Sequence, residues 1–147
     1  MENPNNPAPE PNSKPATKSY DEQWKEFKGY NSVEFLTSEN FEFTVANTSP
    51  TLVFFYAPWC KHCSTVKPDY AKAAATVEKE GTGQLAVVDV TMQQEWSDTF
   101  GLTGLPTFKL YKKDGTAEDY QREGGRSYQD FVDYMRRKSA ESKKDEL

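Results

Sequence analysis

The segment TLVFFYAPWCKHC, residues 51–63, decides the fold. Its first seven residues form a continuous apolar run, which is typical of a central strand covered on both faces of its sheet. Pro58 ends this strand, and the pattern that follows predicts a helix over residues 60–79. The two cysteines of the chain, Cys60 and Cys63, therefore lie where a buried strand passes into a helix.

This position favours a reactive thiol at Cys60. In the first turn of a helix, unpaired N–H groups and the positive end of the dipole stabilise an anion, which lowers the pKa of a thiol. Cys63 lies nearly one turn further on, so the two sulfurs face the same side and can form a disulfide. Lys61 and His62 add positive charge that stabilises the reduced form, and this makes the disulfide a stronger oxidant. Trp59, with the proline before it, is expected to shield one side of the pair while leaving Cys60 exposed.

Other uses of the two cysteines fit the sequence less well. A zinc site takes four ligands, and the whole chain has only two cysteines and one histidine. Covalent haem attachment requires a histidine directly after the second cysteine, where Ser64 stands. An inert disulfide or two buried thiols remain as alternatives, although so short a loop is a poor staple. We therefore expect neither a metal nor a cofactor.

The hydrophobic pattern predicts strands and helices that alternate around this segment. Strands are expected over residues 32–36, 51–57, 84–90, 107–111 and 116–121, and helices around Phe41, over 60–79, over 93–100 and from Ser127. Ser127 and Asp130 form a capping box for the last helix, and its core face consists of Tyr128, Phe131, Val132 and Met135. The order βαβαβαββα indicates an α/β fold, with a central mixed sheet flanked by helices on both faces.

Composition divides the 147 residues into one domain and two ends. Residues 1–30 hold five of the nine prolines, which predicts a disordered proline-rich arm or linker. Within it, the aromatic side chains of residues 20–28 could form one or two amphipathic turns packed on the domain. Residues 31–138 are expected to form the domain, and residues 139–147 a flexible tail.

The ends and the overall charge narrow the classes of function. The net charge is −5 and no basic stripe alternates with aromatics, so nucleic-acid binding is not expected. No apolar run approaches the roughly 18 residues of a membrane span. Residues 144–147 read KDEL, an address for retention in the endoplasmic reticulum, yet residues 1–15 lack the apolar region of a signal peptide. These observations predict a mature fragment located in the endoplasmic reticulum lumen.

Several motifs together resemble one known family. Residues 55–63, followed by Lys67 and Pro68, resemble the active-site strand and helix of a protein disulfide isomerase catalytic domain, a branch of the thioredoxin family. Residues 104–108 resemble that family's loop with a cis-proline, residues 111–115 its hairpin, and residues 120–126 the stretch that carries a mobile arginine. The resemblance spans residues 31–138, so it implies a thioredoxin-like fold.

The resemblance also implies roles for individual residues. Cys60 matches the exposed nucleophile that forms a mixed disulfide with the substrate, and Cys63 matches the buried partner that resolves it. Leu105 matches the residue whose backbone pairs with an extended substrate, and Pro106 matches the cis-proline. Arg126 matches the arginine that approaches the second cysteine and lowers its pKa. Exposed apolar surface near Trp59 is expected to contribute to substrate binding.

The chain departs from the family's pattern at three positions. The residue after the first cysteine is usually glycine, and here it is Lys61. The family also places a buried glutamate six residues before the first cysteine, as a proton acceptor for the second, and pairs it with a lysine on the next strand. Those two positions are Phe54 and Val87 here. Replacing both members of a buried ion pair can be neutral for stability, but it leaves open how Cys63 loses its proton.

Taken together, the resemblance implies an enzyme that forms, reduces and rearranges disulfides in folding secretory proteins. The expected partners are unfolded or partly folded chains, glutathione or an oxidase of the endoplasmic reticulum, and further domains of a longer chain. One alternative is a slow-turnover chaperone or substrate-binding module of the same family, since Phe54 replaces the buried acid. Another is a thioredoxin-like reductant, which the retention address and the Lys61-His62 pair disfavour.

Overall fold

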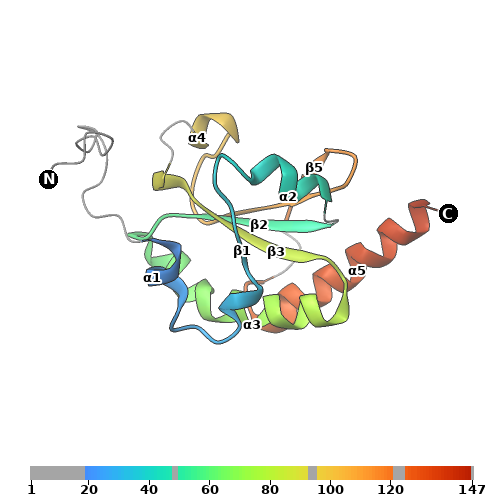
Figure 1. The fold of residues 1–147 in the computed structure, drawn as a ribbon, viewed down its shortest axis with the longest axis horizontal. Coiled ribbons are helices and arrows are strands. Elements are labelled where there is room, and N and C mark those ends of the chain that lie inside the picture. Colours follow the sequence, from blue (N-terminus) through green and yellow to red (C-terminus); the bar gives the residue numbers. More distant parts are fainter. Residues whose placement is uncertain (1–18, 48–49, 93–95, 121–124, 147) are drawn as a thin grey trace, which may run out of the picture.

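The computed structural model describes residues 19–47, 50–92, 96–120 and 125–146, which fold around one five-stranded sheet (Figure 1). Its strands lie in the order β1-β3-β2-β4-β5. They span Glu34–Phe35 (β1), Thr51–Tyr56 (β2), Gln84–Asp89 (β3), Thr107–Tyr111 (β4) and Ala117–Asp119 (β5). Strand β3 pairs in parallel with β1 and β2, whereas β4 pairs antiparallel with β2 and with β5. The predicted mixed sheet is confirmed.

Helices cover both faces of the sheet. Figure 1 shows α1, α3 and α5 on one face and α2 and α4 on the other. They span Tyr20–Trp24 (α1), Phe41–Asn47 (α2), Lys61–Glu80 (α3), Trp96–Thr99 (α4) and Tyr128–Glu146 (α5), with short 3₁₀ turns at Tyr30–Ser32 and Val90–Met92. The expected order βαβαβαββα is therefore confirmed, preceded by one further helix, α1.

Strand β2 is the centre of the fold because all six of its residues are buried. Its side chains alternate between the two faces. Leu52, Phe54 and Tyr56 pack against α1, α3 and α5, whereas Val53 and Phe55 pack beneath α2 and α4. A continuous apolar run is what this two-sided burial requires.

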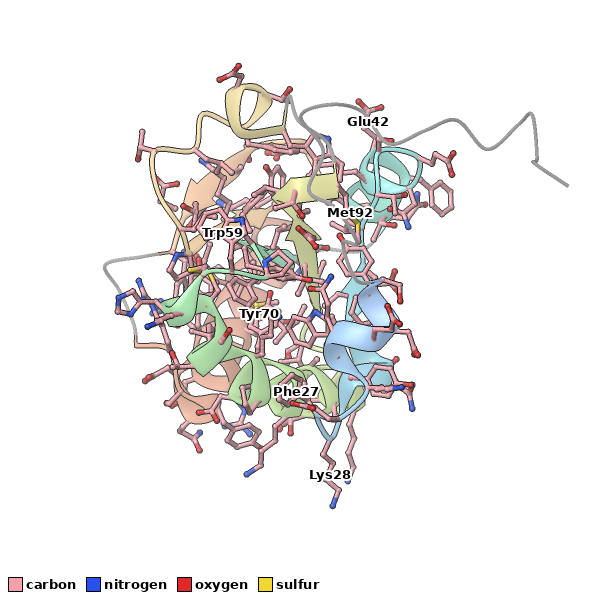
Figure 2. The ribbon with its side chains drawn as sticks, turned by 90° about the vertical axis from the view of Figure 1, so that its left-hand side faces the viewer. Phe27, Lys28, Glu42, Trp59, Tyr70 and Met92 are labelled. Carbon is pink, nitrogen blue, oxygen red and sulfur yellow. A yellow bond between two sulfur atoms is a disulfide. The ribbon has the colours of Figure 1, made fainter. Side chains whose placement is uncertain are left out.

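The helix that follows is bounded by its own sequence. Cys60 is the N-cap of α3, and Gly81 ends the helix with a left-handed backbone (φ +71°) that favours glycine. Pro68 lies inside the helix, and Tyr70 anchors it to the sheet (Figure 2). The Tyr70 hydroxyl lies 2.8 Å from two backbone carbonyl oxygens, one on β2 and one on β3. The middle of α3, the helix whose start carries both cysteines, is therefore tied to the central strands.

The last helix begins as its sequence predicts. The Asp130 N–H donates to the Ser127 hydroxyl oxygen, and the Ser127 N–H donates to the Asp130 carboxylate, each at 3.2 Å. This is the expected capping box. Phe131, Val132 and Met135 are buried against the sheet, as their spacing predicts. In the hairpin before it, Gly115 adopts φ +91°, in agreement with the predicted turn.

The structure corrects both ends of the predicted domain. Ser19 and Glu22 form a capping box for α1, and Trp24 is completely buried against β2 and α3. The expectation of a disordered arm over residues 1–30 is therefore wrong for residues 19–30, whereas the amphipathic turn within residues 20–28 that packs on the domain is confirmed. Residues 1–18 lie outside the described part. At the other end α5 continues to Glu146 rather than giving way to a flexible tail at 139, and Ser139 is buried. Within the described ranges, no helix has the length and apolarity that a membrane crossing requires.

Candidate functional site

Cys60 and Cys63 form a disulfide at the amino end of α3 (Figure 2). Their Cα atoms are 5.2 Å apart, a separation that a disulfide spans readily. Cys60 is buried, with 9% exposure, and Cys63 is fully buried, so the expectation of an exposed Cys60 is corrected: it is only the less deeply buried of the two. The Cys63 N–H donates to the Cys60 Sγ at 3.2 Å, so a backbone donor of the first turn faces this sulfur. Such a donor stabilises a thiolate at Cys60 once the disulfide is reduced.

The residues around the pair are exposed and partly cationic. Lys61 and His62 follow Cys60 on the first turn of α3, and both are exposed. The Trp59 side chain is 64% exposed, and Figure 2 shows it beside the amino end of α3. Trp59 is thus one of the two large hydrophobic residues left exposed in the described part of the chain, and it lies next to Cys60 in the sequence.

A pocket of about 350 Å³ opens beside His62. It is lined by His62, Thr103, Gly104, Leu105, Pro106, Thr107 and Arg126. The peptide bond between Leu105 and Pro106 is cis, as the resemblance implied. The pocket therefore brings together four of the residues singled out in the sequence, from the start of α3, the loop before β4 and the segment before α5.

Arg126 joins this pocket from a distant part of the chain. Its guanidinium lies 5.9 Å from the centre of the Phe108 ring, and its residue is exposed. Thr103, Gly104 and Thr107 were not assigned to the site from sequence. The Thr107 hydroxyl donates to the Gly104 carbonyl at 2.6 Å and closes the loop that holds the cis-proline. The position of Thr107, a polar residue directly after Leu105 and Pro106, was the signal in the sequence that could have assigned it to the site.

The sheet beneath the disulfide is apolar at the two departures from the family's pattern. Phe54 and Val87 are direct neighbours across β2 and β3, and both are fully buried. The Phe54 ring stacks on Phe108, with centroids 4.9 Å apart and planes 12° apart. The positions expected for a buried acid and its lysine are thus occupied by an aromatic and an aliphatic side chain, both packed in the core.

A buried polar cluster, which the sequence did not reveal, lies at the carboxyl ends of β2 and β3. The Trp24 indole N–H donates to the Tyr56 hydroxyl at 3.0 Å, and that hydroxyl donates to Gln23 Oε1 at 2.6 Å. Gln23 Nε2 in turn donates to the Asp89 carboxylate at 3.0 Å. Lys67 completes the cluster, with Nζ 4.7 Å from the centre of the Tyr56 ring. We call these five residues the polar cluster.

The cluster is shielded from water. Burial raises the pKa of Tyr56 far above its usual range, and the nearby Asp89 charge acts in the same direction. Asp89 is fully buried, and its other oxygen accepts hydrogen bonds from the Thr91 N–H and hydroxyl. The sequence did contain a signal that Lys67 belongs to this region: Lys67 lies four residues after Cys63, one turn further along α3. The part of the chain that the structure describes contains no group of three or more metal-ligating side chains.

Comparison with known proteins places this architecture in a family. The family model described as thioredoxin matches residues 32–137. The protein disulfide-isomerase of Oryctolagus cuniculus is 38% identical over 109 residues, which are 74% of this chain and 21% of that protein. Protein disulfide-isomerase A4 of Rattus norvegicus is 42% identical over 113 residues, 76% of this chain and 17% of that protein. The chain thus spans about a fifth of the length of these curated relatives.

A solved structure agrees along most of its length. The first thioredoxin domain of mouse protein disulfide-isomerase A4 superposes with a TM-score of 0.65 and 34% identity. The match covers 86% of this chain and 88% of that domain. The fold, the cysteine pair at the start of α3 and these similarities lead to one conclusion: the chain belongs to the thioredoxin family.

Proposed function

We propose that this chain is a thiol–disulfide oxidoreductase domain that forms, reduces and rearranges disulfides in folding secretory proteins. The observation that carries the proposal is the Cys60–Cys63 disulfide at the amino end of α3, in which Cys60 is 9% exposed and Cys63 is fully buried. The loop with the cis bond before Pro106 lies close by, in the pocket that His62 lines. The similarity to protein disulfide-isomerases supports the same activity.

Exchange proceeds through a mixed disulfide. When the domain oxidises a substrate, a substrate thiolate attacks Cys60 Sγ, the Cys60–Cys63 bond breaks, and Cys63 leaves as a thiolate that takes up a proton. A second substrate thiolate then attacks the substrate sulfur of the mixed disulfide and releases Cys60 as a thiolate. The substrate loses two electrons, which the dithiol now holds. In reduction the Cys60 thiolate attacks a substrate disulfide, and Cys63 resolves the intermediate.

The pocket supports a proposal for substrate recognition. The backbone at Leu105 pairs with an extended segment of the substrate, and Pro106 turns this backbone toward the disulfide. Trp59 contacts apolar side chains on the other side of Cys60. Arg126 supplies a positive charge at the same pocket and assists the ionisation of Cys63. His62 and Lys61 stabilise the Cys60 thiolate.

Location and partners follow from the same assignment. The terminal KDEL supports residence in the endoplasmic reticulum lumen. There the dithiol is reoxidised by glutathione disulfide or by an oxidase. Since the chain spans about a fifth of its relatives, we propose that further domains hold the substrate during isomerisation.

A second function is favoured by one observation, the apolar pair Phe54 and Val87 beneath the disulfide. Without the acid, proton transfer from Cys63 is slow, and the domain acts chiefly by binding unfolded chains. Refolding of scrambled ribonuclease and reduction of insulin separate the two functions, with Cys60→Ser as control. Turnover lost in Cys60→Ser establishes the oxidoreductase. Suppression of aggregation without turnover, equal in both proteins, establishes the binding module.

The reduction potential separates a folding oxidant from a reductant. We expect a value nearer to about −180 mV than to about −270 mV, because Lys61 and His62 favour the reduced form. Equilibration with glutathione buffers, followed by alkylation and mass spectrometry, measures it. A potential near the lower value contradicts an oxidising role and favours the thioredoxin-like reductant.

A further inference from the structure

Lys67 is a buried cation on the helix that carries both cysteines. Lys67 is only 7% exposed, and lysines are rarely buried to this extent unless other groups stabilise their charge. We propose that the Lys67 ammonium promotes ionisation of Cys63, and so supplies from α3 an electrostatic aid that Phe54 and Val87 no longer provide from the sheet. The inference rests on the proposed exchange activity and deepens it.

The helix places Lys67 next to Cys63. The two residues are four apart on α3, so they lie on the same face, with Cβ atoms about 5–6 Å apart. Both are buried, so this face is the one turned to the sheet. Helical side chains lean toward the amino end of their helix, which directs the Lys67 stem back toward the turn of Cys63.

Two aromatic rings hold the ammonium in the core. Lys67 Nζ lies 4.7 Å from the centre of the Tyr56 ring and 5.5 Å from that of Trp24. The faces of such rings attract a cation electrostatically. The two rings are themselves joined by the hydrogen bond from the Trp24 indole to the Tyr56 hydroxyl. Cys63, Tyr56 and Trp24 belong to one packed core, so the charge and the thiol share a region of low dielectric.

The titratable groups in the core that contains Cys63, and in the pocket and polar cluster next to it, come from several elements. They include Tyr20 of α1, Tyr56 of β2, Asp89 of β3, His62, Lys67 and Tyr70 of α3, Tyr120 after β5 and Arg126 before α5. Asp89 is the acid among them, and its oxygens are taken up by Gln23 and Thr91 at the far end of the polar cluster. His62 and Arg126 are exposed, so water screens their charges. Lys67 is the buried cation within this set.

The charge acts at the step that resolves the mixed disulfide. Cys63 gives its proton to water, and the thiolate attacks Cys60 Sγ in the Cys60–substrate disulfide. The Cys60–Cys63 bond forms, the bond to the substrate sulfur breaks, and that sulfur leaves as a thiolate that takes up a proton. The domain's dithiol loses the two electrons that the substrate disulfide gains. An opposite charge close to a thiol favours the thiolate, so we expect the Lys67 ammonium to raise the Cys63 thiolate population about tenfold at a pH below the midpoint of its titration.

The first experiment measures the Cys63 thiolate without any turnover. In a Cys60→Ser chain Cys63 is the only cysteine, and its ¹³Cβ resonance is followed against pH. Lys67→Met keeps the length of the side chain and removes the charge. We expect the midpoint to rise, so that the thiolate fraction at neutral pH falls about tenfold.

Lys72→Met is the matched control for this titration. Lys72 lies on the same helix with Nζ 4.5 Å from the centre of the Tyr128 ring, but it is exposed. We expect its replacement to leave the Cys63 midpoint unchanged. A shift in Lys67→Met no larger than in Lys72→Met overturns the proposal.

A second measurement keeps Lys67 in place, in case Lys67→Met does not fold. In the Cys60→Ser chain, the ¹³Cε resonance of Lys67 should move with the same midpoint as Cys63 and stay still in Cys60→Ser/Cys63→Ser. A Lys67 chemical shift that does not change as Cys63 ionises overturns the inference.

Kinetics distinguish failure of the inference from failure of the proposed function. With both cysteines present, release of nitrothiobenzoate from its mixed disulfide on Cys60 should be about tenfold slower in Lys67→Met near neutral pH and equal at high pH. Release at the wild-type rate at every pH overturns the role of Lys67 while leaving the enzyme intact. Wild-type protein that turns over no substrate disulfide refutes the proposed function, whatever the titration gives.

Discussion

Two regions of the core lie side by side on the face of the sheet that α3 covers, and they differ in chemistry. Around Phe54 the core is a dry aromatic layer in which Val87 and Phe108 are the neighbours across β3 and β4. Two residues further along β2, Tyr56 belongs to the polar cluster with Asp89 and Lys67. Charge is thus absent at Phe54 and Val87 in the middle of the strands and present in Asp89 at the carboxyl end of β3.

The difference shows that a buried charge is tolerated where partners reach it. The rings around Phe54 include Tyr56 and Tyr70, but both hydroxyls are already engaged in hydrogen bonds, so a lone carboxylate there would lack partners. At the strand ends α1 delivers Gln23 and Trp24, and the loop after β3 delivers Thr91. Helix α1, which lies outside the predicted domain boundary, is therefore what makes the polar cluster possible.

Trp24→Ala should disrupt the polar cluster and cause the largest loss of stability among these variants. The side chain is fully buried, carries a hydrogen bond and contacts several rings, so truncation should lower the free energy of unfolding by about 3–5 kcal/mol. Chemical denaturation followed by circular dichroism measures this loss. Trp59→Ala is the matched control, because Trp59 is 64% exposed, and its effect should stay within about 0.5 kcal/mol. Equal effects would show that α1 is not part of the domain.

Phe54→Glu tests the apolar side. A carboxyl group without partners in this layer should lower the free energy of unfolding by about 3 kcal/mol at neutral pH. Burial raises the pKa of that carboxyl, so the folded state holds its proton more tightly than the unfolded chain. The variant should therefore lose least stability below about pH 4, and more as the pH rises. Urea titrations at several pH values measure this profile.

The double variant Phe54→Glu/Val87→Lys is the control for this substitution. The added cation should recover much of the lost stability, whereas Phe54→Leu should cost far less throughout. If Phe54→Glu folds, its rate of oxidising a peptide dithiol should change more than its reduction potential does. Unchanged turnover would contradict a role for this position in proton transfer.

Tyr56→Phe tests how much the Tyr56 hydroxyl contributes to the stability of the polar cluster. Removing the hydroxyl leaves the Trp24 indole N–H and Gln23 Oε1 without this partner, which should cost about 1–3 kcal/mol at neutral pH. Burial raises the pKa of Tyr56, so the wild-type protein loses stability above about pH 10, where tyrosines of the unfolded chain ionise. The variant should lose less between about pH 10 and 11. Denaturation at neutral and alkaline pH checks both effects, and parallel alkaline profiles would contradict the second.

Lys61→Gly should give the smallest effect, since Lys61 is an exposed charge next to the disulfide rather than a buried one. Exposed charge interactions are worth up to about 1 kcal/mol, so the reduction potential should become more negative by about 10–20 mV. A glutathione redox titration measures the change. Lys61→Gln removes the charge without adding glycine, and it should reproduce the shift. An unchanged potential in both variants would show that the charge at this position does not tune the disulfide.

Much of the fold was predictable because its signals are local. The apolar run that became β2, the cysteines at the start of α3, the Ser127–Asp130 capping box and the glycine turn at Gly115 each depend on residues close in sequence. The boundary errors have the opposite cause. The arm was judged by its prolines, whereas Trp24 is ordered by contacts with β2 and α3, more than thirty residues away. The tail was judged by its polar residues, yet α5 simply continues through them.

By itself, then, the sequence determined the order of the elements, the disulfide at the start of α3 and the absence of an acid at Phe54, since each follows from residue type and short-range spacing. Tertiary structure decided which distant groups meet. It joined Arg126 to His62 and the loop of Pro106, and it enclosed Lys67 with Tyr56, Trp24 and Asp89. The physical reason is that burial and partnership depend on all the elements packed around a group. A lysine that looks like one more helix surface charge became a buried cation one turn from Cys63 only when α1 packed over it.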